Sequence, residues 1–270
     1  MFDITLILTL LALGLFAGFV AGMFGIGGGG IIVPILTTIF LNKGFSPDLA
    51  LHMALGTSMA TIIVTSFSSF RTHNKGGFVV WSIFWYIAPG VIVGTLLGSS
   101  IAVRINYVYL ALFFSIFMFF SSLKMFFSKA QTQKLAKTFK NYIHFIAGIF
   151  IGIISALVSI GGGVLNVPYL NFQGIDIKKA IGTSATIGFP IAIGGTLGYI
   201  INGINVTNLN ELNLGYVNLG CFFFISFASF LAAPLGAKTV RKIPSKLIKK
   251  LFAIIPFTLS IRMFFEILGA

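Results

Sequence analysis

The chain has 270 residues, of which 57% are hydrophobic and only 9% are charged, and its formal net charge is +13. Because soluble domains carry about 25% charged residues, this composition excludes a water-soluble protein and predicts one that lies in a membrane. Most of its apolar stretches are close to the roughly 20 residues that a helix needs to cross a bilayer, and they lack the alternation of barrel strands. In chain order they are residues 4–24, 28–41, 47–70, 78–101, 106–123, 141–159, 162–172, 180–201, 214–237 and 250–268. The sequence therefore predicts an all-α polytopic membrane protein.

One motif occurs twice, at an offset of 134 residues: an isoleucine, three glycines and, five residues later, a proline. Its copies are Ile26-Gly27-Gly28-Gly29 with Pro34, and Ile160-Gly161-Gly162-Gly163 with Pro168. A second motif, Ala-Leu-Gly-Thr-Ser at residues 54–58, recurs as Ala-Ile-Gly-Thr-Ser at residues 180–184. We therefore predict two homologous membrane repeats, residues 1–127 and 141–270, joined by a basic linker at residues 128–140. Five segments per half is an odd number, so the second repeat is expected to be inverted relative to the first.

The repeated glycines and prolines interrupt long apolar stretches. Glycine favours unusual backbone angles, and proline is well tolerated in the first turn of a helix. We expect a non-helical glycine segment in each half, followed by a helix that starts near Pro34 or Pro168. Paired interruptions at corresponding places in two halves are a strong sequence indication of a transporter binding site.

The basic residues indicate the orientation of the chain. If both short segments, 28–41 and 162–172, cross the membrane, all 18 lysines and arginines except Lys43, Arg104 and Arg262 fall in loops on one side. Positive loops favour the cytoplasm, so both termini are expected on the periplasmic or extracellular side of the cell (inner) membrane. The alternative, in which both short segments are re-entrant, separates the two most basic loops. Because the positive charge lies in short loops between spanning segments, it does not indicate a nucleic-acid partner.

The glycine-proline segments and the Gly-Thr-Ser pairs resemble those of the TauE/SafE family of membrane permeases. The resemblance covers nearly the whole chain, and it implies transport of sulfite, sulfonates or other sulfur-containing organic anions, with the direction left open. The chain departs from symmetry at one place. The first half has four glycines, residues 27–30, whereas the second half has Val164 at the fourth position.

The candidate substrate site is the place where residues 27–34 meet residues 161–168. Backbone N–H groups at the start of a helix, together with the positive end of its dipole, bind anions. The alternative is that the glycines only allow close helix packing. Hydroxyl and amide side chains near these segments are further candidates, although serine and threonine often bond their own helix backbone instead. The predicted substrate-binding residues are Gly27, Gly28, Gly29, Pro34, Thr57, Ser58, Gly161, Gly162, Gly163, Asn166, Pro168, Thr183 and Ser184.

Acidic residues are scarce, and all five lie at segment ends or in loops. An anion therefore suits the predicted site better than a cation. His52 and His144 are expected to be interfacial residues more than proton carriers. The sequence indicates no enzyme chemistry, metal site or cofactor. In particular, the Gly-Gly-Gly segments lack the Lys-Ser/Thr of a phosphate-binding loop. The function expected is secondary transport of a small anion by alternating access, and the alternatives are an anion channel and a membrane scaffold without a transported substrate.

Overall fold

The structure, a computed structural model, describes residues 3–127, 139–206 and 212–244, together with 247, 254, 257–258, 260–261 and 263–265. Most of the predicted linker, residues 128–140, and much of the last predicted segment, 250–268, lie outside the described residues. The division into two repeats with a linker therefore stays a prediction.

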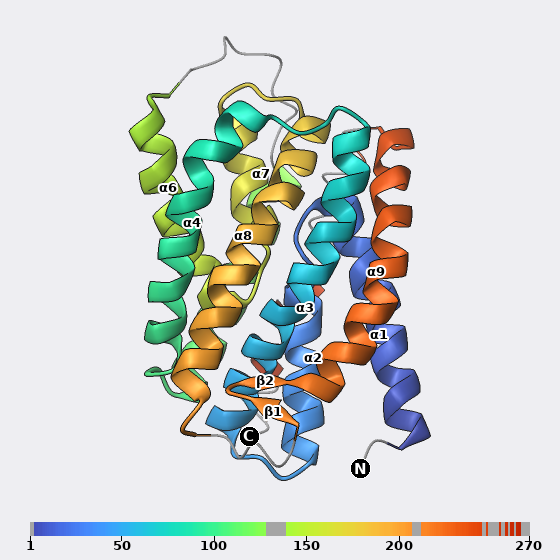
Figure 1. Ribbon diagram of the computed structural model, residues 1–270, viewed down its shortest axis with the longest axis vertical. Helices are drawn as coiled ribbons and strands as arrows, with labels where there is room; N and C mark the ends of the chain where they lie inside the picture. Colours follow the sequence, from blue (N-terminus) through green and yellow to red (C-terminus); the bar gives the residue numbers. More distant parts are fainter. Residues whose placement is uncertain are drawn as a thin grey trace.

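The described part of the chain is a bundle of helices with one short hairpin (Figure 1). Six of its helices are long and apolar enough to cross a membrane, which confirms the prediction of an all-α polytopic membrane protein. The elements are α1 (Ile4–Phe24), α2 (Gly29–Asn42), α3 (Pro47–Lys75), α4 (Trp81–Ala102), α5 (Tyr107–Phe127), α6 (Asn141–Val158), α7 (Gly163–Phe172), α8 (Ile177–Gly203), β1 (Asn213–Leu214), β2 (Val217–Asn218) and α9 (Leu219–Lys242).

The two halves run through the bundle in opposite directions. In the view of Figure 1, α1 rises from the lower end, α2 returns to that end, α3 rises and α4 descends. In the second half α6 descends, α7 returns upward, α8 descends and α9 rises. An inverted repeat requires such directions.

Helices of one half pack closely on helices of the other. α1 lies along α9 and α4 lies along α6, while α3 and α8 pack together in the interior. Glycines at four-residue spacing make the outer contacts close: a Cβ at Gly94 of α4 would stand 2.9 Å from Ile149 Cα of α6, and one at Gly18 of α1 would stand 2.5 Å from Ser229 Cα of α9. Small residues of this kind let membrane helices approach without a large apolar interface.

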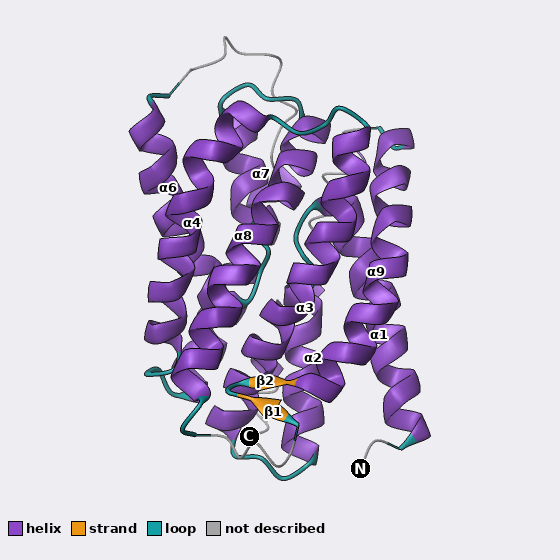
Figure 2. Cartoon of the chain, in the orientation of Figure 1, coloured by secondary structure: helices purple, strands orange, loops and turns teal. Residues whose placement is uncertain are grey.

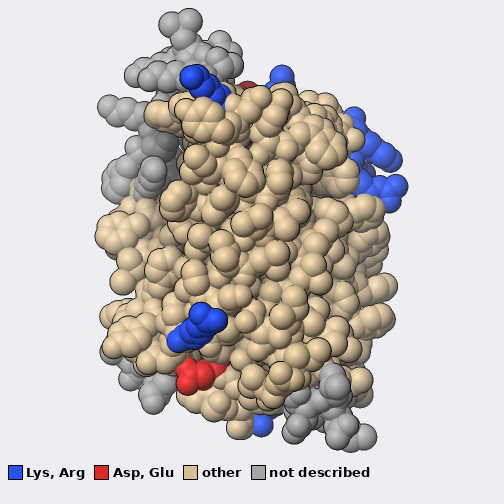
Figure 3. All heavy atoms as spheres, turned by 60° about the vertical axis from the view of Figure 1, so that its left-hand side comes forward, with Lys and Arg blue, Asp and Glu red and all other residues tan. Residues whose placement is uncertain are grey.

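The surface of the bundle suits a lipid environment. Large apolar side chains on the outer helices are exposed, among them Phe16 (58%), Trp85 (66%) and Phe223 (63%). In Figure 3, the lysines, arginines and acidic residues of one face lie in its upper and lower parts, and the band across its middle shows none. Exposed hydrocarbon in an uncharged band between two polar ends is expected of a protein that spans a bilayer.

Two details of the sequence prediction are wrong. The helices after the glycines start at Gly29 and Gly163, not near Pro34 or Pro168, so each proline lies in the second turn. The left-handed glycine before each helix already supplies the turn, and the helix can begin at once. The predicted segment 214–237 is also not all helix, because residues 213–218 form an antiparallel hairpin and α9 starts only after it.

Candidate functional site

Two glycine loops interrupt the helices deep inside the bundle, where Figure 2 shows them as loop between α1 and α2 and between α6 and α7. Gly28 and Gly162 occupy the same place in each loop, as the residue that precedes the following helix, with φ angles of 84° and 78°. This left-handed conformation favours glycine over residues with a Cβ. The predicted interruption of both apolar stretches is therefore confirmed.

The two loops touch each other through their backbones. The Gly161 N–H donates a hydrogen bond to the Ile26 carbonyl at 2.9 Å. A Cβ on Gly27 would stand 2.9 Å from Gly161 Cα, a distance that leaves no room for a side chain. The glycines at this crossing thus allow both the close approach of the two loops and the positive φ angles. The two interpretations made from the sequence, close packing and a broken helix, therefore apply to the same glycines.

A close contact between a glycine of one half and a carbonyl of the other occurs on either side of this crossing. A Cβ on Gly29 would clash with the Ser159 carbonyl, and a Cβ on Gly163 would stand 2.6 Å from the Gly25 carbonyl. In each case the glycine is the first residue of a short helix, and the carbonyl belongs to the end of the other half's long helix. Even alanine is too large at these two positions.

The first turns of α2 and α7 therefore start next to each other inside the bundle and lead away in opposite directions (Figure 1). No side chain caps the start of either helix. The first N–H groups of a helix have no partner within the helix, and together they carry about half a positive charge. Two such helix starts form an electropositive region without any charged side chain.

Asn166 is the clearest polar side chain at the crossing. It lies in the first turn of α7, is completely buried, and neither its Oδ1 nor its Nδ2 has a hydrogen-bond partner. A buried polar group without a partner costs about 1–3 kcal/mol, and such a group calls for an explanation. Ser58 of α3 shows the same combination of complete burial and an unpaired Oγ. The protein therefore leaves the hydrogen-bonding groups of these two side chains unsatisfied.

The remaining hydroxyl candidates already have partners. Thr57 Oγ1 accepts from the Asn218 N–H at 2.9 Å, and Thr183 Oγ1 accepts from the Val80 N–H at 2.9 Å. Asn218 and Val80 are the residues that precede α9 and α4, so each threonine holds the start of a helix from the other half. Ser184 donates to the Gly25 carbonyl at 3.2 Å. The structure thus separates Ser58 and Asn166 from three residues whose hydrogen bonds tie the two halves together.

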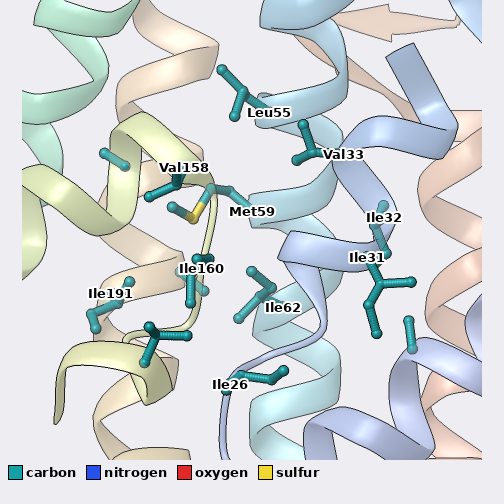
Figure 4. Close-up of a cluster of buried hydrophobic side chains, with 14 of the residues drawn as sticks. Ile26, Ile31, Ile32, Val33, Leu55, Met59, Ile62, Val158, Ile160 and Ile191 are labelled. Carbon is teal, nitrogen blue, oxygen red and sulfur yellow. The ribbon is translucent and has the colours of Figure 1, made fainter. Parts of the chain in front are cut away.

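Sequence reasoning missed Ser66 and Ser69 of α3, which line a narrow pocket beside Gly25 and Gly27. Both serines lie within a serine- and threonine-rich stretch of a spanning helix, and this stretch is the feature of the sequence that could have indicated them. Around the crossing, apolar side chains from several helices fill the interior (Figure 4); Ile26, Met59, Ile62, Ile160 and Ile191 are among them.

Charged groups of the described residues lie at helix ends, away from the crossing. Asp3 and Asp176 cap α1 and α8 with their carboxylates, and Asp48 lies in the first turn of α3. Within the part of the chain that the structure describes, no three histidine, cysteine or acidic side chains gather as metal ligands would. His52 and His144 are held by the Ala102 carbonyl at 3.1 Å and by the Tyr169 hydroxyl at 2.9 Å.

The fold and the site together define a multi-pass membrane protein built around two broken helices. Comparison with known proteins gives the family: the model of the sulfite exporter TauE/SafE family matches residues 10–263. The chain belongs to this family, and the resemblance seen in its motifs is confirmed.

Curated relatives agree with this assignment. A probable membrane transporter protein of Haemophilus influenzae is 36% identical over 262 residues, which cover 97% of this chain and 99% of the relative. A probable membrane transporter protein of Methanocaldococcus jannaschii is 28% identical and covers 91% of each chain. A third, YdhB of Bacillus subtilis, is 25% identical over 93% of this chain and 96% of its own length. No solved structure matches the chain significantly.

Proposed function

We propose that the chain is a secondary transporter that moves a small anion, sulfite or an organosulfur oxyanion, across the cell (inner) membrane by alternating access. One observation carries the proposal: the uncapped starts of α2 and α7 meet inside a bundle whose described charged residues lie at helix ends. Backbone amides at a helix start bind anions without a cation nearby, and such a weak site suits a substrate that must leave again. The family description and the relatives' names support transport of this kind.

The proposed orientation places the basic ends of the helices in the cytoplasm. Lys75, Lys140, Lys178 and Lys242 lie at the end of the bundle that is uppermost in Figure 1, where α3 and α9 end and α6 and α8 begin. Lys43 and Arg104 lie at the opposite end. Positively charged loops favour the cytoplasmic side, so this distribution supports termini outside the cytoplasm.

A carrier explains the site better than a channel does. The pocket beside Gly27 is so narrow that it has no room for a water molecule, and the apolar residues of Figure 4 occupy the space around the crossing. A channel needs a continuous polar path, whereas a carrier is closed on at least one side at any moment. A scaffold without a substrate would have no use for the unpaired side chains of Asn166 and Ser58.

The test is counterflow of radiolabelled sulfite into proteoliposomes that contain the purified protein. Unlabelled sulfite inside the vesicles should accelerate uptake of label, because exchange through a carrier is faster than net flux. Uptake that is equally fast without internal sulfite would indicate a channel. No uptake of sulfite, sulfate, thiosulfate or taurine would refute the proposal.

The glycines provide a matched pair of variants for this assay. Gly163→Ala should abolish counterflow, because its Cβ would stand 2.6 Å from the Gly25 carbonyl. Gly30→Ala should retain it, because the added Cβ meets only the flexible end of Met118, and the second half has Val164 at the corresponding place. Equal counterflow in the two variants would show that the loop crossing is not part of the transport site.

A further inference from the structure

We infer that the pocket lined by Ser66 and Ser69 is an oxyanion subsite, and that the corresponding place in the second half is a gate closed by Met59 and Ile191. The inference rests on the proposed transport function and assigns separate roles to two places that the repeat makes equivalent. The subsite lies on the side of the crossing that leads to the basic end of the bundle, because α3 ends there (Figure 1).

The hydroxyl pocket is built from the first glycine loop and three helices, α1, α3 and α8. Ser66 and Ser69 lie on α3 and are 2% and 1% exposed. The other residues that line the pocket are Ala21, Gly25, Gly27, Thr65 and Ala185. Ser69 Oγ has no hydrogen-bond partner although it is buried. A buried hydroxyl that lines a pocket and has no hydrogen-bond partner can donate to an acceptor that enters the pocket.

The repeat places a counterpart of this pocket on the other side of the crossing. The glycine loops are related by an offset of 134 residues, so Gly27 corresponds to Gly161. The Gly-Thr-Ser motifs are related by an offset of 126 residues, so Ser66 corresponds to Ala192 and Ser69 corresponds to Gly195. By the same offset Ala185 corresponds to Met59. On α8 the counterparts of Thr65, Ser66 and Ser69 are therefore apolar, namely Ile191, Ala192 and Gly195. The facing wall differs in the opposite sense, because Ser155 and Ser159 stand where the first half has Ala21 and Gly25.

Apolar side chains fill that second place. Met59 lies directly against Gly195, since a Cβ there would be 2.9 Å from its sulfur. Ile191 lies against Gly162 in the same way, with its Cδ1 at 2.5 Å from the Cβ position. Met59 and Ile191 are both completely buried, and Figure 4 shows them in one cluster with Val158 and Ile160. Residues of this kind form a dry plug that excludes water and ions.

The chemistry of the hydroxyl pocket, which has to widen before a ligand can enter, selects an oxyanion. Its two serine hydroxyls and the neighbouring helix start supply donors, and none of the residues that line it carries a positive charge. An ammonium or metal cation would find no carboxylate there, whereas an anion with several oxygens accepts from several donors at once. Asn166 is the unpaired side chain next to the plug, because its Nδ2 also lies against Gly162. It is therefore placed to receive the anion when the plug opens.

Sulfite binding to the purified full-length protein tests the subsite. The double variant Ser66→Ala/Ser69→Gly converts the pocket wall to the residues of its counterpart and should raise the Kd for sulfite at least ~10-fold, because hydrogen bonds to a charged group contribute more than those between neutral groups. Ser115→Ala is the control, since Ser115 is also a buried serine without a partner but does not line the pocket. It should leave the Kd unchanged.

The outcomes separate the two proposals. If the wild type binds none of sulfite, sulfate, thiosulfate and taurine, the proposed function fails and the subsite with it. If the wild type binds sulfite and the double variant binds it equally well, the transport site stands and the subsite is refuted.

The gate is tested by the accessibility of matched cysteines in a Cys221→Ala background. Ser66→Cys should react with a small methanethiosulfonate reagent at least ~10-fold faster than its counterpart Ala192→Cys, because widening a hydroxyl-lined pocket admits water more readily than opening a dry plug. Adding Met59→Ala, which installs the residue found at position 185, should accelerate the reaction of Ala192→Cys. Equal rates for the two cysteines, or no acceleration by Met59→Ala, would overturn the assignment of the gate.

Discussion

Removing one hydroxyl from Thr57 should cost the protein stability without changing what it binds. In the wild type the Asn218 N–H donates to Thr57 Oγ1 at 2.9 Å, and in Thr57→Val this buried N–H loses its acceptor. An unpaired buried donor costs about 1–3 kcal/mol, and a chain of this size loses about 2 °C in Tm per kcal/mol, so the expected fall is about 2–6 °C. Thr183→Val should cost as much, because its partner, the Val80 N–H, is at the same distance.

The assay is thermal unfolding in detergent together with sulfite binding, and Thr186→Val is the control. Thr186 is a buried residue of the same helix as Thr183, but its hydroxyl donates at 3.0 Å to the Gly182 carbonyl within the helix, so its loss strands no donor. Its Tm should stay within about 1 °C of the wild type, in line with a small change in stability. A large rise in the Kd for sulfite with an unchanged Tm, in Thr57→Val and Thr183→Val, would show that these threonines bind substrate and do not hold helix starts.

Three further predictions concern the site, the packing and the orientation. Asn166→Leu should abolish sulfite counterflow and raise the Tm, because it removes two unpaired buried polar atoms, and a lower Tm would mean that the amide has a structural partner. Gly94→Leu should prevent α4 from packing on α6, so the protein should lose its monodisperse peak in size-exclusion chromatography while Gly30→Ala keeps it; a monodisperse Gly94→Leu contradicts the close contact. With Cys221→Ala as background, Lys75→Cys should label from the cytoplasm and Ser46→Cys from the other side, and the reverse pattern would invert the proposed orientation.

Much of the fold could be predicted because its causes are local. Apolar stretches of spanning length are helices wherever the surrounding solvent is lipid, and this holds for the described helices. The glycine interruptions were visible for the same reason, since three successive glycines weaken a helix whatever surrounds them. The helix starts at Gly29 and Gly163 were not predicted, because proline in the second turn is uncommon in water and is tolerated where neighbouring groups in a membrane protein satisfy the backbone.

The sequence by itself determined a membrane bundle of helices that is interrupted at two glycine segments, and it pointed to the place where these segments meet. Only the tertiary structure decided which polar side chains at that crossing are free. Thr57 and Ser58 are neighbours in the chain, yet one bonds a backbone N–H more than 150 residues away and the other has no partner. The same holds for Ser66 and Ser69, which line a pocket, and for their counterparts Ala192 and Gly195, the second of which packs against Met59. The physical reason is that a hydroxyl's partner and a pocket's contents are set by groups from distant segments, whose positions depend on the packing of the whole bundle.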